Sequence, residues 1–221
     1  MSSSVIELWN YYRSGTSHRV RIALNLKGIE WTYRPLNLLK SEHKSTQYLH
    51  ANPQGLAPTM LVDGVPLTQS PAILEYIEET WPHPPLLPKK PMDRAKVRAM
   101  AMIIGCDIHP INNLRILNEV KAITGEDGPP LSWIHKWMQQ GFEALESMLF
   151  SDKNRDPGFC FGSAHGLGEC YLIPQIYAAR RFEFDLSPFP LICQIDEHCA
   201  QLPAFMDAHP DQQPDAPDTL S

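Results

Sequence analysis

Apolar residues follow two alternating patterns along the first eighty residues. Short apolar runs typical of strands are separated by segments in which apolar residues recur with the period of a helix. The strand segments are 5–9, 31–37, 59–62 and 65–68, and the helical segments end near residues 26, 50 and 81. Asp63 and Gly64 join the last two strands as a dipeptide typical of a hairpin turn. The predicted order is strand, helix, strand, helix, strand, strand, helix.

The rest of the chain has the helical period alone. The predicted helices are 94–108, 112–123, 132–150, 170–182 and 192–201. The segment Trp81–Pro91 holds five prolines and no periodicity, which is typical of a stiff linker. We therefore expect a first domain over 1–82, a linker over 83–91, an all-helical domain over 92–209 and a flexible tail over 210–221.

Pro58 reduces the number of possible folds for the first domain. It comes just before a predicted strand, where a trans proline would disturb the ladder, so we expect a cis proline in a tight turn. A β-α-β half, a prolyl turn and a β-β-α half form the thioredoxin-like arrangement. The predicted fold class is α/β plus all-α.

Composition and charge remove several function classes. The chain has 221 residues, a net charge of -6 and a pI near 5.8, which argue against a nucleic-acid partner. No run approaches the roughly 20 apolar residues of a membrane span, and the first residues lack signal-peptide features, so we expect a cytoplasmic protein. Its five cysteines form neither a CxxC nor a zinc pattern, and we expect reduced thiols and no metal site.

A hydroxyl-rich turn precedes the first helix. Ser14, Thr16 and Ser17 lie where helix caps are preferred, and the first N–H groups of a helix have no intrahelical acceptor. Together with the helix dipole, these donors can hold an anion such as a thiolate. A plain helix cap is the alternative interpretation. A similar signal follows at Ser70, where we expect an N-cap with Pro71 in the first helical position.

The whole layout resembles the soluble glutathione transferases, and four segments resemble the zeta class of that family. These segments are RSGTSHRVRIAL at 13–24, the stretch from NPQGLAPTM to DGVPLTQSPAILEYIEE, GCDIHPINNLRIL at 105–117 and CYLIPQIYAARRFEFDLSPFPLI at 170–192. The zeta Ser-Ser-Cys turn is altered, because Gly15 and Thr16 replace its second serine and its cysteine. In this respect the turn is closer to bacterial glutathione-dependent maleylpyruvate isomerases. Gly166 with Glu169 also departs from the usual Thr or Ser cap, which weakens a capping box by about 1 kcal/mol.

The resemblance implies glutathione as cofactor and assigns residues to it. Ser14 and Thr16 would direct hydroxyls at the sulfur with Arg13 beside them, and either hydroxyl could be the one in contact. The other implied glutathione residues are Gln69 and Ser70 for the γ-glutamyl end, Ala57 before Pro58 for the cysteinyl unit, and His43 and Gln54 for the glycyl end. A homodimer is implied by the resemblance alone.

Members of this class isomerise maleylacetoacetate or maleylpyruvate, which are small dicarboxylates. Arginine suits such a substrate, because its planar fork takes a carboxylate bidentately. The candidates are Arg13, Arg115 and Arg181, with Arg180 as the alternative to Arg181. His109 and Asn113 are four residues apart, so we expect them on one helix face, where they could meet the substrate.

Two rival functions remain at this point. One is a glutathione transferase or dehalogenase acting on small α-halo acids, and the other is a non-catalytic protein that uses the fold for binding. A disulfide oxidoreductase is disfavoured, because the turn at 14–17 has no cysteine. Maleylpyruvate and maleylacetoacetate present the same reacting group, so both stay open as substrates.

Overall fold

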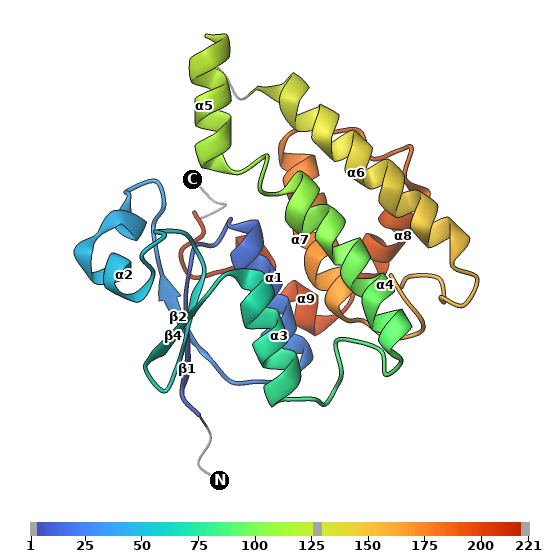
Figure 1. Ribbon diagram of the computed structural model, residues 1–221, viewed down its shortest axis with the longest axis horizontal. Helices are drawn as coiled ribbons and strands as arrows, with labels where there is room; N and C mark the ends of the chain where they lie inside the picture. Colours follow the sequence, from blue (N-terminus) through green and yellow to red (C-terminus); the bar gives the residue numbers. More distant parts are fainter. Residues whose placement is uncertain (1–3, 126–129, 218–221) are drawn as a thin grey trace. The chain divides into compact units, whose positions relative to one another are not determined.

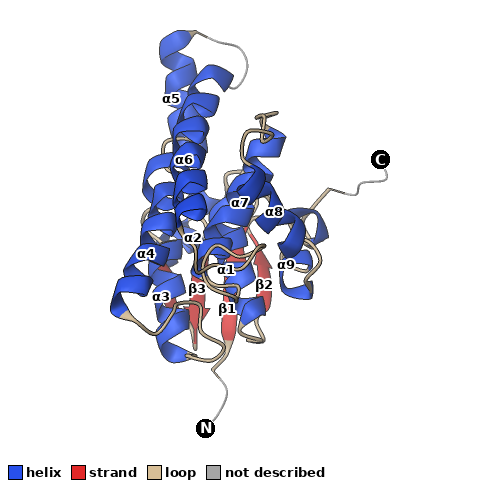
Figure 2. Ribbon diagram, turned by 90° about the vertical axis from the view of Figure 1, so that its right-hand side faces the viewer, coloured by secondary structure: helices blue, strands red, loops and turns tan. Residues whose placement is uncertain are grey.

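The computed structural model describes residues 4–125 and 130–217, which divide into two compact units (Figure 1). Unit 1 contains residues 4–86 and returns with residues 201–217, whereas unit 2 runs from Leu87 to Ala200. The first unit contains the predicted strands, and the described residues of the second form helices and connecting loops only (Figure 2). The predicted combination of a thioredoxin-like part and an all-helical part is confirmed.

Unit 1 is built on a four-stranded mixed sheet. Its strands are β1 (Ile6–Asn10), β2 (Thr32–Pro35), β3 (Thr59–Val62) and β4 (Val65–Thr68), in the order β2-β1-β3-β4. β1 pairs in parallel with β2 and antiparallel with β3, and β3 forms a hairpin with β4. The hairpin turn needs positive φ at both central residues, and Asp63 and Gly64 have φ values of 50° and 83°. Both edge strands contain a proline, which only an edge tolerates.

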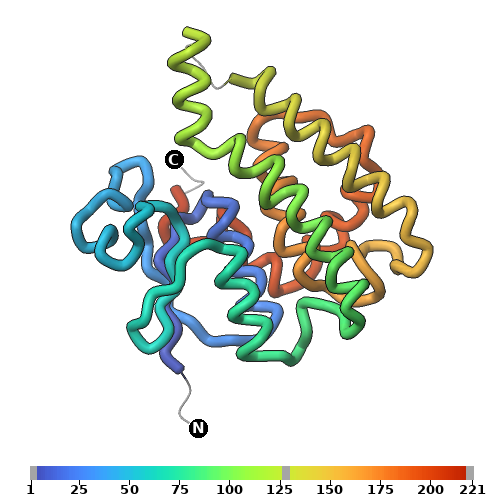
Figure 3. Tube along the Cα trace, viewed as in Figure 1, coloured from blue at the N-terminus to red at the C-terminus, as the bar shows by residue number. Residues whose placement is uncertain are grey.

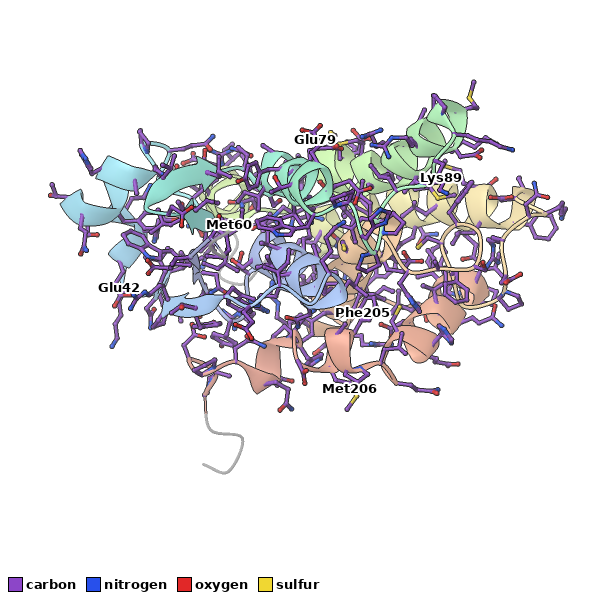
Figure 4. The ribbon with its side chains drawn as sticks, turned by 90° about the horizontal axis from the view of Figure 1, so that it is seen from below. Glu42, Met60, Glu79, Lys89, Phe205 and Met206 are labelled. Atoms are coloured by element: carbon purple, nitrogen blue, oxygen red, sulfur yellow. The ribbon has the colours of Figure 1, made fainter. Side chains whose placement is uncertain are left out.

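Two longer helices complete the core of unit 1. They are α1 (Gly15–Leu26) and α3 (Ser70–Thr80), which pack side by side (Figure 1). Apolar residues of both helices are buried together with Leu8 of β1 and Met60 of β3, the latter labelled in Figure 4. Shorter helices are η1 (Glu42–Lys44), α2 (Thr46–Ala51), α9 (Pro203–Met206) and η3 (Pro210–Gln212). The helix expected over 42–50 is therefore two pieces, divided where Ser45 caps α2.

The start of α3 differs from the prediction. Gln69, not Ser70, is the N-cap, because Gln69 has φ 68° and ψ 109° while Ser70 is already helical. Proline is tolerated throughout a first helical turn, since those N–H groups have no intrahelical acceptor. Pro71 therefore could not distinguish a cap at residue 69 from one at residue 70.

The C-terminal segment also differs from the prediction. Residues 201–217 belong to unit 1 instead of ending the helical domain in a flexible tail. Phe205 of α9 points toward α1 and is buried, whereas Met206 points away (Figure 4). Figure 3 shows this last stretch, drawn in red, returning beside the blue N-terminal part of the chain. Its Pro and Asp content suggested disorder, but its polar groups bond to unit 1; residues 218–221 of the predicted tail lie outside the described residues.

Unit 2 is a helical bundle. Its helices are α4 (Pro91–Met102), the π-helix η2 (Ile103–Ile108), α5 (Leu114–Thr124), α6 (Leu131–Ser151), α7 (Leu167–Arg181) and α8 (Pro190–Cys199). α6 packs closely on η2 at Gly141, where a Cβ would lie 2.3 Å from Ile108 Cδ1. None of the helices within 4–125 and 130–217 is both long and apolar enough to cross a membrane.

Glu169 does more at the start of α7 than the weakened capping box suggested. One carboxylate oxygen accepts the Gly166 N–H at 2.8 Å, and the other accepts the Cys160 N–H at 2.6 Å. Gly166 has no side chain to return the bond, so only the glutamate half of the box is present. Burial raises the pKa of Glu169, while its backbone hydrogen bonds act in the opposite direction.

Candidate functional site

The hydroxyl-rich turn connects β1 to α1. Ser14 is the N-cap of α1, and its Oγ accepts the Ser17 N–H at 3.3 Å, as predicted. The Ser14 N–H donates to the Tyr11 carbonyl at 3.0 Å, which closes the turn. The first turn of α1 contains no acidic side chain, so nothing there neutralises the positive end of the helix dipole. The turn can therefore hold an anion.

The two hydroxyls of this turn are linked in a defined direction. Thr16 Oγ1 donates to the Ala57 carbonyl at 2.9 Å, and Ser14 Oγ lies 2.9 Å from Thr16 Oγ1. A hydroxyl has one proton, so Thr16 has none left for Ser14, and Ser14 must be the donor between them. Ser14 can turn its proton from Thr16 to an incoming anion without breaking the bond to Ala57.

The loop before Pro58 is held by residues that the sequence interpretation missed. Asn52 is buried, and its Nδ2 donates to the Leu56 carbonyl at 2.7 Å, where the Tyr48 hydroxyl also donates. The Gln54 N–H donates to Asn52 Oδ1 at 3.1 Å. The Asn-Pro pair at 52–53 was the available signal, because asparagine often bonds to the backbone two residues on. The Ala57–Pro58 peptide bond is cis, as expected.

The start of α3 is the third part of this region. Gln69 Nε2 donates to Gln54 Oε1, and Arg19 Nη1 lies 3.5 Å from Ser70 Oγ. Arg19 is buried, which agrees with a structural role under the turn. Gln69 has an unusual positive φ for a residue with a side chain, a conformation that costs about 1–3 kcal/mol. Contacts therefore bring Ser14, Thr16, Ala57, Pro58, Gln54, Gln69 and Ser70 into one region of unit 1.

His43 and Arg13 are the remaining candidates in unit 1, and only Arg13 carries a full positive charge at pH 7. Burial, followed by the nearby Lys44 ammonium, lowers the pKa of His43, so its imidazole is neutral at pH 7. It can offer an N–H donor but not a full charge. Arg13 is half-buried next to Ser14, with its Cζ 5.9 Å from the centre of the Tyr12 ring.

The four remaining candidates lie in unit 2, and the expected helix face for two of them is wrong. His109 follows the last residue of η2, and its N–H donates to the Ile104 carbonyl at 2.9 Å. Asn113 is instead the N-cap of α5, and its Oδ1 accepts the Arg115 N–H at 3.2 Å. Pro110 lies between them and has no N–H to continue a helical ladder, so spacing by four does not place them on one face.

The two arginines that end α7 have different surroundings. Arg180 Nη2 donates to Asp196 Oδ2 of α8 at 2.5 Å, which commits it to an ion pair within the bundle. Arg181 is exposed, and its Cζ lies 4.4 Å from the centre of the Phe182 ring. Arg115 is exposed in the first turn of α5. Arg180 is therefore held within the bundle by Asp196.

Comparison with known proteins identifies the family. The glutathione S-transferase N-terminal domain family matches residues 4–79. The curated maleylpyruvate isomerase of a Ralstonia species is 46% identical over 212 residues, which cover 96% of this chain and 100% of the relative. A solved holo structure titled maleyl pyruvate isomerase, a bacterial glutathione S-transferase of the zeta class, has a TM-score of 0.93 over 96% of this chain and 100% of that one, at 46% identity. The chain belongs to the zeta-class glutathione transferase family.

Two maleylacetoacetate isomerases extend the comparison. The maleylacetoacetate isomerase of Pseudomonas aeruginosa is 44% identical over 96% of this chain and 99% of its own length. A crystal structure of maleylacetoacetate isomerase from Anaeromyxobacter dehalogenans, with dicarboxyethyl glutathione and citrate bound in its active site, has a TM-score of 0.87 at 38% identity and covers 99% of this chain and 97% of that one. The zeta-class resemblance expected from the four sequence segments is therefore confirmed over nearly the whole chain.

Proposed function

We propose that this zeta-class chain is a glutathione-dependent cis-trans isomerase. It converts maleylpyruvate to fumarylpyruvate, or maleylacetoacetate to fumarylacetoacetate. The observation that carries the proposal is the directed pair of hydroxyls at the start of α1, in which Ser14 has a proton to give to a thiolate. The names of the relatives supply the substrate class.

The residues of unit 1 fit glutathione. A thiolate is an anion, and the first turn of α1 offers it the Ser14 hydroxyl with no acidic side chain near that helix end. Ala57 offers its backbone to the cysteinyl unit, and its carbonyl position is maintained by Thr16. Gln69 and Ser70 receive the γ-glutamyl carboxylate at the start of α3, where unpaired N–H groups are available. Gln54 and the neutral His43 bind the glycyl end.

Isomerisation requires the protein to keep the glutathione sulfur ionised and to stabilise negative charge on the substrate. When bound, glutathione supplies a thiolate that adds reversibly to the maleyl double bond, which becomes single, rotates and is restored when the thiolate leaves. Ser14 keeps the sulfur ionised, because a hydrogen bond to the charged form lowers a thiol pKa. Cationic side chains stabilise the negative charge that develops on the substrate oxygen while the bond is single.

Arginines perform that second task in the proposal. The carboxylate-binding candidates are Arg13, beside Ser14, in unit 1, and Arg115 and Arg181 in unit 2, since a guanidinium matches a carboxylate in shape and charge. His109 donates to the developing oxygen charge. Asn113 acts indirectly, because its side-chain oxygen caps α5 at Arg115.

The decisive experiment measures isomerisation at limiting glutathione. Maleylpyruvate and maleylacetoacetate are each incubated with the protein and with glutathione at about a tenth of the substrate concentration. Loss of the cis isomer is followed by absorbance. We expect full conversion with all glutathione recovered, and no conversion when glutathione is omitted. If conversion stops once glutathione has been consumed, or only α-halo acids react, the chain is a transferase or dehalogenase and the proposal fails.

The proposal extends to assembly and location. We propose a homodimer in the cytoplasm, on the basis of the family resemblance. Sedimentation equilibrium should give twice the 25.0 kDa mass of one chain. A single-chain mass over the micromolar range would contradict the dimer.

A further inference from the structure

The C-terminal segment contacts the turn that carries Ser14, although more than 180 residues separate them. α9 and the residues after it pack against α1, and Asn25 Nδ2 of α1 donates to the Ala204 carbonyl at 3.1 Å. Gln213 Nε2 donates to the carbonyls of Asp207 and His209, at 2.7 and 2.8 Å, so the segment also stabilises its own path. The last described residues are therefore held in an ordered position against unit 1.

Tyr12 is the residue at which this segment reaches the turn. The Tyr12 N–H donates to Asp215 Oδ2 at 3.1 Å. The Tyr12 carbonyl accepts from Arg21 Nη2 at 2.9 Å, and Arg21 Nε donates to the Ala208 carbonyl at 3.0 Å. Both backbone polar groups of Tyr12 are thus held by the C-terminal segment, directly through Asp215 and indirectly through Arg21. Tyr12 precedes Arg13 and Ser14.

Tyr33 of β2 orients the Asp215 carboxylate. Its hydroxyl donates to Asp215 Oδ1, which leaves Oδ2 for the Tyr12 N–H. Burial, and then the acceptor carboxylate, raise the pKa of Tyr33 well above its usual 10.0, so the hydroxyl keeps its proton at any working pH. The carboxylate is therefore fixed between two donors from two different elements.

We propose that Asp215 is a positioning residue for catalysis, which sets the place of Ser14 by holding the backbone of Tyr12. This inference rests on the proposed function of Ser14 as donor to the glutathione sulfur. A donor must lie within a few tenths of an ångström of its productive position, and a shift of 1 Å can cost about a hundredfold in rate. Bonds to an ionised carboxylate are about twice as strong as neutral ones, which suits this task.

The test compares three full-length variants. Asp215→Ala removes both acceptors. Asp215→Asn keeps an oxygen for the Tyr12 N–H and turns an amide donor toward the Tyr33 hydroxyl, which can accept. Asp207→Asn is the matched control, because Asp207 is an exposed aspartate of the same segment whose carbonyl, not its carboxylate, bonds to Gln213.

Two readouts separate this inference from the proposed function. Amide hydrogen exchange of Tyr12 is measured without glutathione, and the pKa of bound glutathione is measured from thiolate absorbance. We expect Asp215→Ala to speed Tyr12 exchange at least tenfold and to raise the bound thiol pKa by about one unit, equal to tenfold less thiolate below the pKa. Asp215→Asn should change both readouts clearly less than Asp215→Ala, because it keeps a neutral acceptor, and Asp207→Asn should stay near the wild type.

Unchanged Tyr12 exchange and unchanged thiol pKa in Asp215→Ala would overturn the inference, as would equal impairment of Asp215→Asn. If the wild type fails to lower the thiol pKa, the proposed function fails, and Tyr12 exchange still decides whether Asp215 holds the turn. Should Asp215→Ala not fold, Tyr33→Phe loosens the same carboxylate by removing one donor. It should change both readouts in the same direction, and no change would contradict the inference.

Discussion

Replacing Ser14 with alanine tests the direction of the hydroxyl pair. The wild-type Ser14 proton can turn from Thr16 to the sulfur, whereas the Thr16 proton is given to the Ala57 carbonyl. Removing the Ser14 hydroxyl therefore takes away the donor to the thiolate. Removing the Thr16 hydroxyl takes away an acceptor for Ser14 and a contact with Ala57, and leaves the sulfur its donor.

The expected magnitude follows from the strength of a hydrogen bond to a charged atom. Such a bond is worth about 1.5–3 kcal/mol. One pKa unit corresponds to about 1.36 kcal/mol, so Ser14→Ala should raise the pKa of bound glutathione by about 1–2 units, toward the value of about 8.5 of a free thiol. Thr16→Val, which keeps the shape and loses the hydroxyl, should raise it by well under one unit.

The assay titrates bound glutathione by thiolate absorbance in each variant. Ser14 is also the N-cap of α1, and alanine at a cap costs about 1 kcal/mol of stability, whereas glycine costs a few tenths. Ser14→Gly therefore serves as the matched control, since it loses the hydroxyl with little loss of capping. The two Ser14 variants should share the same thiol pKa and differ in thermal midpoint.

A larger pKa rise in Thr16→Val than in Ser14→Ala would refute the assigned direction of the pair. A thiol pKa in Ser14→Gly equal to that of the wild type would remove the Ser14 hydroxyl from the mechanism and leave the dipole of α1 as the only stabilising feature of the turn.

Two further predictions concern stability. Lys27→Met should destabilise the protein by about 3–5 kcal/mol in urea unfolding, because it breaks a buried ion pair in which Lys27 Nζ lies 2.7 Å from Glu78 Oε2. The exposed Lys96→Met is the control and should cost under about 1 kcal/mol. Burial, and then the nearby ring of His198, lower the pKa of His165 from 6.5 to about 4. The folded state thus resists protonation, so thermal stability should be full above pH 6.5 and fall toward pH 4, and His165→Phe should flatten that fall; an unchanged slope would contradict the assignment.

Local signals in the sequence predicted most of unit 1. The strands at 59–62 and 65–68 match β3 and β4 because the Asp-Gly pair sets the turn and thereby the register. The helix cap at Ser14 and the cis peptide bond before Pro58 were also predicted from neighbouring residues in the sequence. Gln69 was missed as the cap because its positive φ depends on tertiary contacts, including that with Gln54.

Features that depend on distant residues were not predictable. Asp215 follows a Pro-rich stretch typical of disorder, and its two partners lie 203 and 182 residues earlier, where no periodic pattern connects them. The predicted helix 94–108 changes to a π-helix at Ile103. The sequence did not indicate this change, because apolar spacing does not distinguish i→i−4 from i→i−5 bonding. The expectation for His109 and Asn113 failed for a different reason, because Pro110 between them cannot continue the helical ladder.

Buried cations within α1 and at its C-cap explain how one helix can position the groups around the turn at Ser14. Arg19, Arg21 and Lys27 are all buried, and a buried cation is costly unless its N–H groups are bonded. Each therefore requires acceptors at fixed places: Ser70 at the start of α3 for Arg19, and Asn10, Tyr12 and Ala208 for Arg21. Lys27 requires Glu78 and the carbonyls of residues 81 and 84. Apolar contacts of α1 could tolerate small shifts of its neighbours, but these directional hydrogen bonds cannot. The helix that begins after Ser14 therefore also fixes the end of β1, the turn before α1 and the start of α3.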